Sequence, residues 1–145
     1  MEDLIRTILE GYGLPKEGLH GPRHWIRVNR VGLELAKACG ADAEVVHMFA
    51  LFHDSRRENE DWDPDHGLRG AELARSMAGS HLLHLNHAQF QLLHHACVHH
   101  TDGETSMDPT IGCCWDADRL DLGRVGIEPA VEYLSTAAAR AMLRP

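Results

Sequence analysis

Apolar residues recur along much of this chain at the three- and four-residue spacing of a helix that buries one face. In the segment 22–39 they fall on one side, at Trp25, Val28, Val31, Leu35 and Cys39. Almost none of the chain alternates apolar and polar residues as a strand does, and Gly and Pro separate the periodic segments. The pattern therefore predicts an all-α, compact bundle of about six or seven helices.

Helix start and stop signals set the expected bounds. The predicted helices cover residues 2–10, 22–39, 43–54, 66–78, 86–100, 109–122 and 129–143. Pro22 suits a first helical turn, Gly40 suits a C-terminal cap, and Asp42 and Asp108 suit N-caps. The last segment is rich in Ala, which favours helix. We see no linker or repeat and expect a single domain over residues 1–145.

One predicted helix is unusually apolar and ends in two polar residues. The run Val45–Phe52 contains one polar residue, His47, and is followed directly by His53-Asp54. Buried charged groups must be paired or must coordinate a metal. His24 and Asp118 add a second imidazole and a second carboxylate from distant parts of the chain. The four residues predict a divalent-metal site.

Composition narrows the class of protein. The formal net charge of −8 and the pI near 5.8 disfavour a broad nucleic-acid-binding surface, although they allow a small phosphate pocket. No apolar run approaches the roughly 20 residues that span a bilayer. The acidic start, Met1-Glu2-Asp3, lacks the features of a secretory signal. We expect a cytoplasmic protein with four reduced cysteines. The 12 histidines cluster along helical segments, which favours metal or proton chemistry.

Three segments together resemble the H…HD…D signature of the HD superfamily of metal-dependent phosphohydrolases. The matching segments are 20–28 around His24, 50–54 ending in His53-Asp54, and 116–121 around Asp118, in the family's order. The resemblance extends from about His20 to Arg124. It implies an HD-domain bundle with the site between central helices. It also implies hydrolysis of a phosphate ester of a small nucleotide-like or phosphorylated metabolite by attack of metal-bound water.

The resemblance implies that His24, His53, Asp54 and Asp118 hold one divalent ion. Imidazole and carboxylate ligands suit Mn, Fe, Co, Ni, Zn or Mg. Such a metal lowers the pKa of bound water towards about 7 and polarises the phosphoryl group. Asp54 could both ligate the metal and orient the attacking water.

A second ion is implied if the resemblance extends to the binuclear HD branch, which includes the HD-GYP phosphodiesterases. The segments 66–70 and 99–103 are similar to that branch's additional ligand motifs. Asp54 would then bridge two metals, and His66, His99 and His100 would hold the second. The chain has Gly103-Glu104-Thr105 where the branch has GYP, so specificity for cyclic di-GMP is not implied.

The catalytic acid found three residues after the ligand Asp in several branches is replaced here by Arg57. Glu58, Asp61 and Asp121 are the alternative candidates for a general acid. Arg57 could instead bind substrate phosphate, because a guanidinium pairs well with phosphate oxygens. Two further arginines could share that role, namely Arg23 and Arg56.

Three other residues are candidates for substrate contact, and two of them have a structural alternative. His20 precedes His24 by one helical turn and could line the site or cap the helix. Arg119 could contact substrate or hold the last motif in place. Trp62 lies in the charged loop 56–65 and could contact a substrate ring, and this loop could form a lid.

Other functions remain open from the sequence alone. A dinuclear-iron oxygenase of the HD type would need a substrate-binding Lys, and the chain has only Lys16 and Lys37. A non-catalytic metal- or nucleotide-binding module would be expected to lose ligands. A nuclease is disfavoured by the acidic balance. We expect a small phosphorylated substrate and no membrane partner, with the chain acting alone or as a homo-oligomer.

Overall fold

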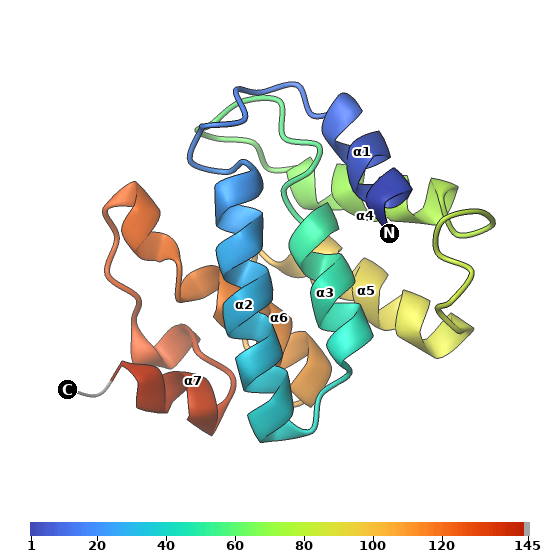
Figure 1. Ribbon diagram of the computed structural model, residues 1–145. Coiled ribbons are helices and arrows are strands. Elements are labelled where there is room, and N and C mark those ends of the chain that lie inside the picture. The colour runs from blue at the N-terminus through green and yellow to red at the C-terminus, as the bar shows by residue number, and fades with distance from the viewer. Residues whose placement is uncertain (144–145) are drawn as a thin grey trace.

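Seven α-helices and two short 3₁₀ helices make up the computed structural model, which describes residues 1–143 (Figure 1). They are α1 (Glu2–Glu10), α2 (Pro22–Cys39), α3 (Ala43–Phe52), α4 (His66–Ser76), α5 (His87–His99), α6 (Pro109–Arg119), η1 (Leu122–Val125), η2 (Val131–Tyr133) and α7 (Ala137–Met142). No strand occurs in this part of the chain, so the predicted all-α fold is confirmed. Within the same residues, no helix is both long enough and apolar enough to cross a membrane.

The first six α-helices agree with the predicted bounds to within three residues, and several of their ends carry local signals. Pro22 occupies the first turn of α2, and Gly40 ends the helix with φ of 69°. The carboxylate of Asp42 accepts hydrogen bonds from the backbone N–H groups of Glu44 and Val45 at the start of α3. Asp108 caps α6 in the same way. These caps depend only on neighbouring residues, so a sequence can reveal them.

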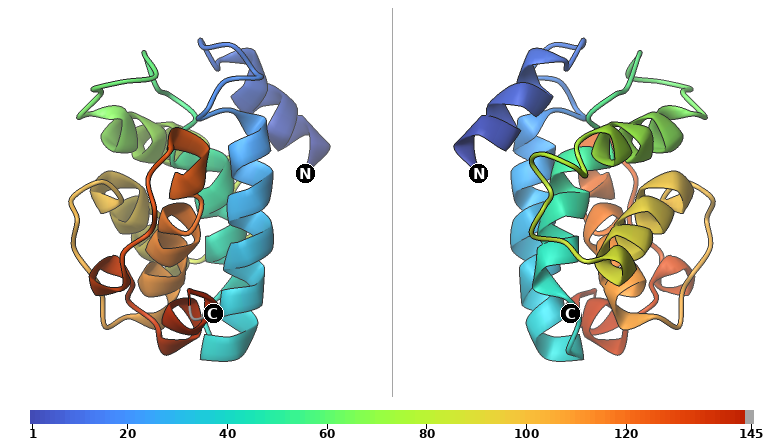
Figure 2. Two further views of the ribbon diagram at one scale, coloured as in Figure 1. Left: turned by 90° about the vertical axis from the view of Figure 1, so that its left-hand side faces the viewer. Right: turned by 90° about the vertical axis from the view of Figure 1, so that its right-hand side faces the viewer.

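Helix α3 lies at the centre of the bundle. Its buried face comprises Val45, Val46, Met48, Phe49, Ala50 and Phe52. It packs against α2, α5 and α6, with α4 near its C-terminal end (Figures 1 and 2). The helix therefore carries the next two residues, His53 and Asp54, into the protein interior, where each is at most 2% exposed.

Helix α4 approaches its neighbours closely at two glycines that lie on one face. A Cβ atom on Gly70 would lie 2.2 Å from the carbonyl oxygen of Phe52, at the end of α3. A Cβ atom on Gly67 would lie 2.3 Å from the carbonyl oxygen of Cys97, near the end of α5. Only a residue without a side chain permits such an approach. The crossing brings His66, the first residue of α4, beside the ends of both helices.

The predicted helix 129–143 is wrong over its first half. The chain forms the short η2 helix there, and α7 begins only at Ala137. The reason is the buried carboxylate of Asp116, which accepts hydrogen bonds from the backbone N–H groups of Ser135 and Thr136 and from the Thr136 hydroxyl. Thr136 in turn caps α7. A contact between residues so far apart in sequence outweighs the helix propensity of the segment.

Candidate metal centre

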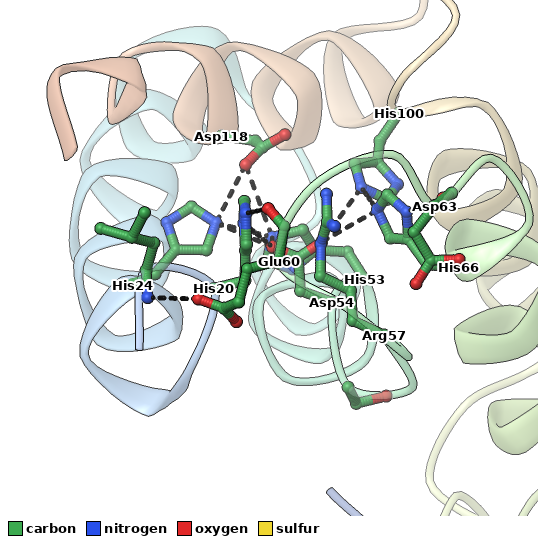
Figure 3. A network of polar contacts seen from close by, with 12 residues as sticks. His20, His24, His53, Asp54, Arg57, Glu60, Asp63, His66, His100 and Asp118 are labelled. Carbon is green, nitrogen blue, oxygen red and sulfur yellow. Dashed lines mark hydrogen bonds and ion pairs between the residues drawn. The ribbon is translucent and has the colours of Figure 1, made fainter. Parts of the chain in front are cut away.

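Six side chains from five segments meet in the interior as two groups of possible metal ligands. The first group is His24 from α2, His53 and Asp54 after α3, and Asp118 from α6; the second is Asp54, His66 from α4, and His100 after α5. Figure 3 shows His24 and Asp118 on one side of Asp54 and His66 and His100 on the other. Five of the six residues are buried, and Asp118 is partly exposed.

Asp54 belongs to both groups because its two carboxylate oxygens face in different directions. Its Oδ2 atom lies 3.3 Å from Nε2 of His24. Its Oδ1 atom lies 3.1 Å from Nε2 of His66 and 3.4 Å from Nε2 of His100. The buried Oδ2 atom has no hydrogen-bond partner. A buried carboxylate oxygen without a hydrogen bond is stabilised by a nearby cation.

The histidine rings are held so that each turns its Nε2 atom into the site. The Nδ1 atoms of His53, His66 and His100 donate to the carbonyl oxygens of Phe49, Asp63 and Cys97, at 3.0, 2.6 and 2.7 Å. Nδ1 of His24 lies 2.7 Å from a carboxylate oxygen of Asp121. Metal-binding histidines characteristically donate their second ring nitrogen to such groups.

The inward-facing nitrogens approach each other in pairs. Nε2 of His24 lies 3.0 Å from Nε2 of His53, and Nε2 of His66 lies 3.0 Å from Nε2 of His100. With the protons on Nδ1, each pair brings two lone pairs together, which is unfavourable unless a cation lies between them. The donor set therefore fits one divalent ion in each group, with Asp54 shared.

Electrostatics also favour positive charge in the site. Burial alone would lower the pKa of His24, but contacts with Asp118, Asp121 and Asp54 raise this pKa to about 10. Burial alone would raise the pKa of Asp54, but the charge of His53 and the nearby imidazoles of His100, His20 and His24 hold this pKa well below its usual range. The same balance lowers the pKa of Asp118. The carboxylates thus remain ionised and attract a cation, either a metal or a proton.

A cleft of about 260 Å³ connects the site with the protein surface. Its walls include Asp54, Asp118, His20 and three arginines, which are Arg57, Arg119 and Arg124. Nε of Arg57 lies 3.5 Å from Oδ1 of Asp54, and Nη2 of Arg124 lies 3.8 Å from Oδ1 of Asp118. Both guanidinium side chains are at least nine-tenths buried. The cleft thus places two guanidinium groups beside the candidate ligands.

Comparison with solved structures gives a close match over the whole chain. The crystal structure of a predicted HD superfamily hydrolase from an uncultured Thermotogales bacterium superposes with a TM-score of 0.75 at 26% sequence identity. The match covers 98% of this chain and 82% of that one. The resemblance to the HD superfamily is confirmed. No protein-family model matches the chain, and no curated protein does.

The fold brings all of the predicted metal ligands together in the interior except His99. Its side chain is 40% exposed, and its Nδ1 atom pairs with Asp102 at 2.6 Å. Adjacent residues of a helix point about 100° apart, so His100 can face the site only if His99 turns away. The expectation that His99 ligates a second metal is therefore not met by this geometry.

Several predicted catalytic or substrate-binding residues also lie away from the cleft. Glu58 is 70% exposed at its side chain and pairs with Arg69. Arg56 donates to the carbonyl oxygens of Ile8 and Ser55, so it anchors α1 and does not enter the cleft. Arg23 is exposed on α2 and is absent from the cleft wall. Tertiary packing determines where these side chains lie, and the sequence motif gives no information about that packing.

Other predicted contact residues do lie at or near the site. His20 is buried, with Nδ1 3.5 Å from Oδ2 of Asp54. Arg57 lines the cleft, as described above. Arg119 lines it too, but its Nη1 atom donates to the carbonyl oxygens of Glu104 and Tyr133, which favours the structural alternative. Trp62 is 82% exposed and lines a neighbouring cleft.

Two residues contribute to the site in ways that the sequence analysis did not predict. Asp121 was expected only as a weak candidate acid, yet it orients the ring of His24 and also accepts from Nε of Arg27. Its spacing of three residues after Asp118 was the available signal, because such residues lie on one helical face. Arg124 was not predicted at all. It reaches the cleft because η1 follows α6 directly.

Proposed function

We propose that the protein is a metal-dependent phosphohydrolase that acts on a phosphate ester of a small nucleotide-like or phosphorylated metabolite. The observation that carries this proposal is the carboxylate of Asp54, which joins two groups of inward-facing imidazole nitrogens beneath a cleft lined by arginines. A divalent metal held by these residues would act as a Lewis acid towards the phosphoryl group and lower the pKa of a bound water to about 7.

The ligand residues have distinct tasks in this proposal. His24, His53 and Asp118 would hold one ion, His66 and His100 would hold the other, and Asp54 would contact both. The Nδ1 hydrogen bonds of the histidines fix the rings before any ion binds, which reduces the reorganisation that binding requires.

Arg57 and Arg124 would bind and orient the phosphate. Their side chains line the same cleft, Arg57 beside Asp54 and Arg124 beside Asp118. The Nε atom of Arg57 is buried and has no hydrogen-bond partner, so it can donate to a phosphate oxygen. Arg124 is held by hydrogen bonds from its Nε to the carbonyl oxygen of Leu19 and from its Nη1 to that of Asp121, which leaves Nη2 directed towards Asp118.

A pair of donor groups that share a carboxylate is also what a dinuclear-iron oxygenase would need. That alternative further requires a cation such as Lys to bind its substrate. Lys16 and Lys37 are both exposed, and neither lines the cleft. The two arginines beside the donor groups support phosphate chemistry better than oxygenation.

Metal content per chain, measured by elemental analysis on protein without a His-tag, tests the ligand assignment. We expect two ions in the wild type, one fewer in Asp118→Ala and in His66→Ala, and none in Asp54→Ala. His84→Ala removes a surface histidine and serves as the matched control, with unchanged metal content.

Release of inorganic phosphate from a panel of phosphate monoesters, with a coupled assay for diesters, tests the activity. The three ligand variants should lose activity in parallel with their metal, whereas His84→Ala should retain it. The proposal is refuted if the wild type binds no metal after reloading, or if the loaded protein cleaves no phosphate ester. Iron as the resident metal without phosphatase activity would support the oxygenase.

A further inference from the structure

A second cleft adjoins the one over the donor groups. It has a volume of about 270 Å³ and shares Arg57 and Thr101 with the first cleft. It reaches from His66, in the second donor group, outward to Trp62 in the loop after α3. The two clefts therefore adjoin at Arg57 and Thr101, beside the donor groups.

The two clefts differ in charge. The first has three arginines in its wall, and its carboxylates, Asp54 and Asp118, are candidate metal ligands. The wall of the second contains three carboxylates, from Asp61, Asp63 and Asp102, and one guanidinium, from Arg57. Asp63 is neutralised by an ion pair with Arg69, and Asp102 pairs with His99. The second cleft still offers carboxylate oxygens, which accept hydrogen bonds from hydroxyl or amino groups and repel anions.

Trp62 gives the second cleft an exposed aromatic face. Its side chain is 82% exposed, whereas Trp25 and Trp115 are 3% and 2% exposed within the core. A large exposed aromatic residue beside a site often marks a binding surface. Its flat ring can stack on another ring, an interaction worth about 1–3 kcal/mol for a nucleic-acid base. Pro64 and Asp61 line the same cleft as Trp62.

We propose that this second cleft binds the leaving group of the substrate, and that the group is an uncharged, ring-bearing alcohol such as a nucleoside. The inference rests on the proposed phosphohydrolase function and specifies its substrate class as a nucleoside monophosphate. The phosphate lies by Arg57 and Arg124, the ring stacks on Trp62, and hydroxyl or amino groups donate to Asp61 and Asp102.

The reaction balances as a simple hydrolysis. The bond between phosphorus and the nucleoside oxygen breaks, and a bond between phosphorus and the oxygen of water forms. The leaving oxygen takes up one proton, and the products are the nucleoside and inorganic phosphate. A nucleoside triphosphate would place additional negative charge among carboxylates or outside the arginine-lined cleft, so it should be a poor substrate.

Steady-state kinetics with three probes test the subsite on the metal-loaded full chain. The probes are adenosine monophosphate, adenosine triphosphate and glycerol 3-phosphate, which has no ring. We expect Trp62→Ala to raise KM for adenosine monophosphate about tenfold or more, by loss of ring stacking. The KM for glycerol 3-phosphate should not change. Trp62→Phe keeps a flat ring and should restore most of the affinity, and Leu83→Ala, at another exposed apolar residue, should have no effect.

Replacing both Asp61 and Asp102 with Asn should reduce the ratio of kcat/KM for adenosine monophosphate to kcat/KM for adenosine triphosphate. Equal effects of Trp62→Ala on the ring-bearing and ringless substrates would overturn the proposal, as would a wild-type enzyme that prefers the triphosphate.

Tryptophan fluorescence separates failure of the subsite from failure of the proposed activity. Because Trp25 and Trp115 are buried, a ligand-induced change that disappears in Trp62→Phe reports on Trp62. Saturable quenching by adenosine monophosphate but not by glycerol 3-phosphate supports the subsite, even if the protein hydrolyses neither compound. Absence of such quenching in a protein that does hydrolyse phosphate esters overturns the subsite and leaves the proposed function intact.

Discussion

Replacing Gly70 with Ala should disrupt the second donor group without changing any ligand. Gly70 lies one turn after His66 on α4, where the helix crosses the end of α3. The new Cβ atom would lie 2.2 Å from the carbonyl oxygen of Phe52 and 3.2 Å from its carbonyl carbon. These are backbone atoms, so no side-chain rotation can relieve the clash. The two helices must separate by roughly 1 Å to restore ordinary contact.

The free-energy change follows from two opposing terms. Ala is favoured over Gly within a helix by about 1 kcal/mol. Overpacking typically costs about 1–3 kcal/mol, and a clash with rigid backbone belongs at or above the upper end of this range. We therefore expect a net loss of about 2 kcal/mol in unfolding free energy. For a chain of this size the melting temperature should fall by roughly 5–8 °C.

The same displacement should affect metal binding. His66 would move away from Asp54. In the wild type, the Nε2 atom of His66 lies 3.1 Å from the Oδ1 atom of Asp54. Ligand distances in metal sites are held to within about 0.2 Å, so a shift of roughly 1 Å should abolish binding at the second group. The first group, which uses no residue of α4, should retain its ion.

Thermal unfolding of the metal-free protein and elemental analysis of the loaded protein measure the two effects separately. Gly79→Ala is the matched control, because a Cβ atom there meets nothing within 4 Å and Gly79 is not among the glycines with positive φ. The reasoning is refuted if Gly70→Ala melts at the same temperature as Gly79→Ala and holds the same amount of metal as the wild type.

Two further predictions concern His24 and its partner. Asp121→Ala removes the carboxylate that orients the ring, so metal affinity measured by chelator competition should fall about 10–100-fold. Glu128→Gln removes an exposed charge that belongs to neither donor group and should leave the metal affinity unchanged. In the metal-free protein, the pKa of His24 is raised from 6.5 to about 10, so its protonation stabilises the fold near neutral pH, and this stabilisation is lost as the pH rises towards 10. Urea unfolding between pH 7 and 10 should show a decline in the free energy of unfolding. If His24→Asn shows an equal decline, the pH dependence does not come from His24.

The fold was predictable where the signals were local. The helix-end signals at Pro22, Gly40, Asp42 and Asp108 are short-range features. The helices that begin or end at these residues form as expected. Residues 129–136 were mispredicted because their conformation depends on the side chain of Asp116, which lies on another element. Helix propensity carries no information about such a long-range partner.

In the candidate site, too, the residues set by local sequence could be predicted and those set by long-range packing could not. His53 and Asp54 could be located because a helix whose last eight residues are apolar except for His47 leads directly to them, so their burial is expected from the sequence. The arginines could not be assigned in this way, since the direction of a long side chain depends on what surrounds it. Arg56 and Arg57 are adjacent, yet one binds backbone oxygens beneath α1 and the other lies beside Asp54. A sequence motif alone cannot distinguish them.

The donor groups also link the stability of the fold to its proposed function. Buried carboxylates and facing imidazole nitrogens are costly unless a cation compensates them. A bound metal would supply this charge and stabilise the folded chain by about 4 kcal/mol at a free concentration 1,000 times its Kd. Without a metal, the raised pKa of His24 means that a proton supplies part of the same charge. Metal binding must displace this proton, so the apparent affinity of the first group should increase with pH over the range in which the metal-free fold loses stability.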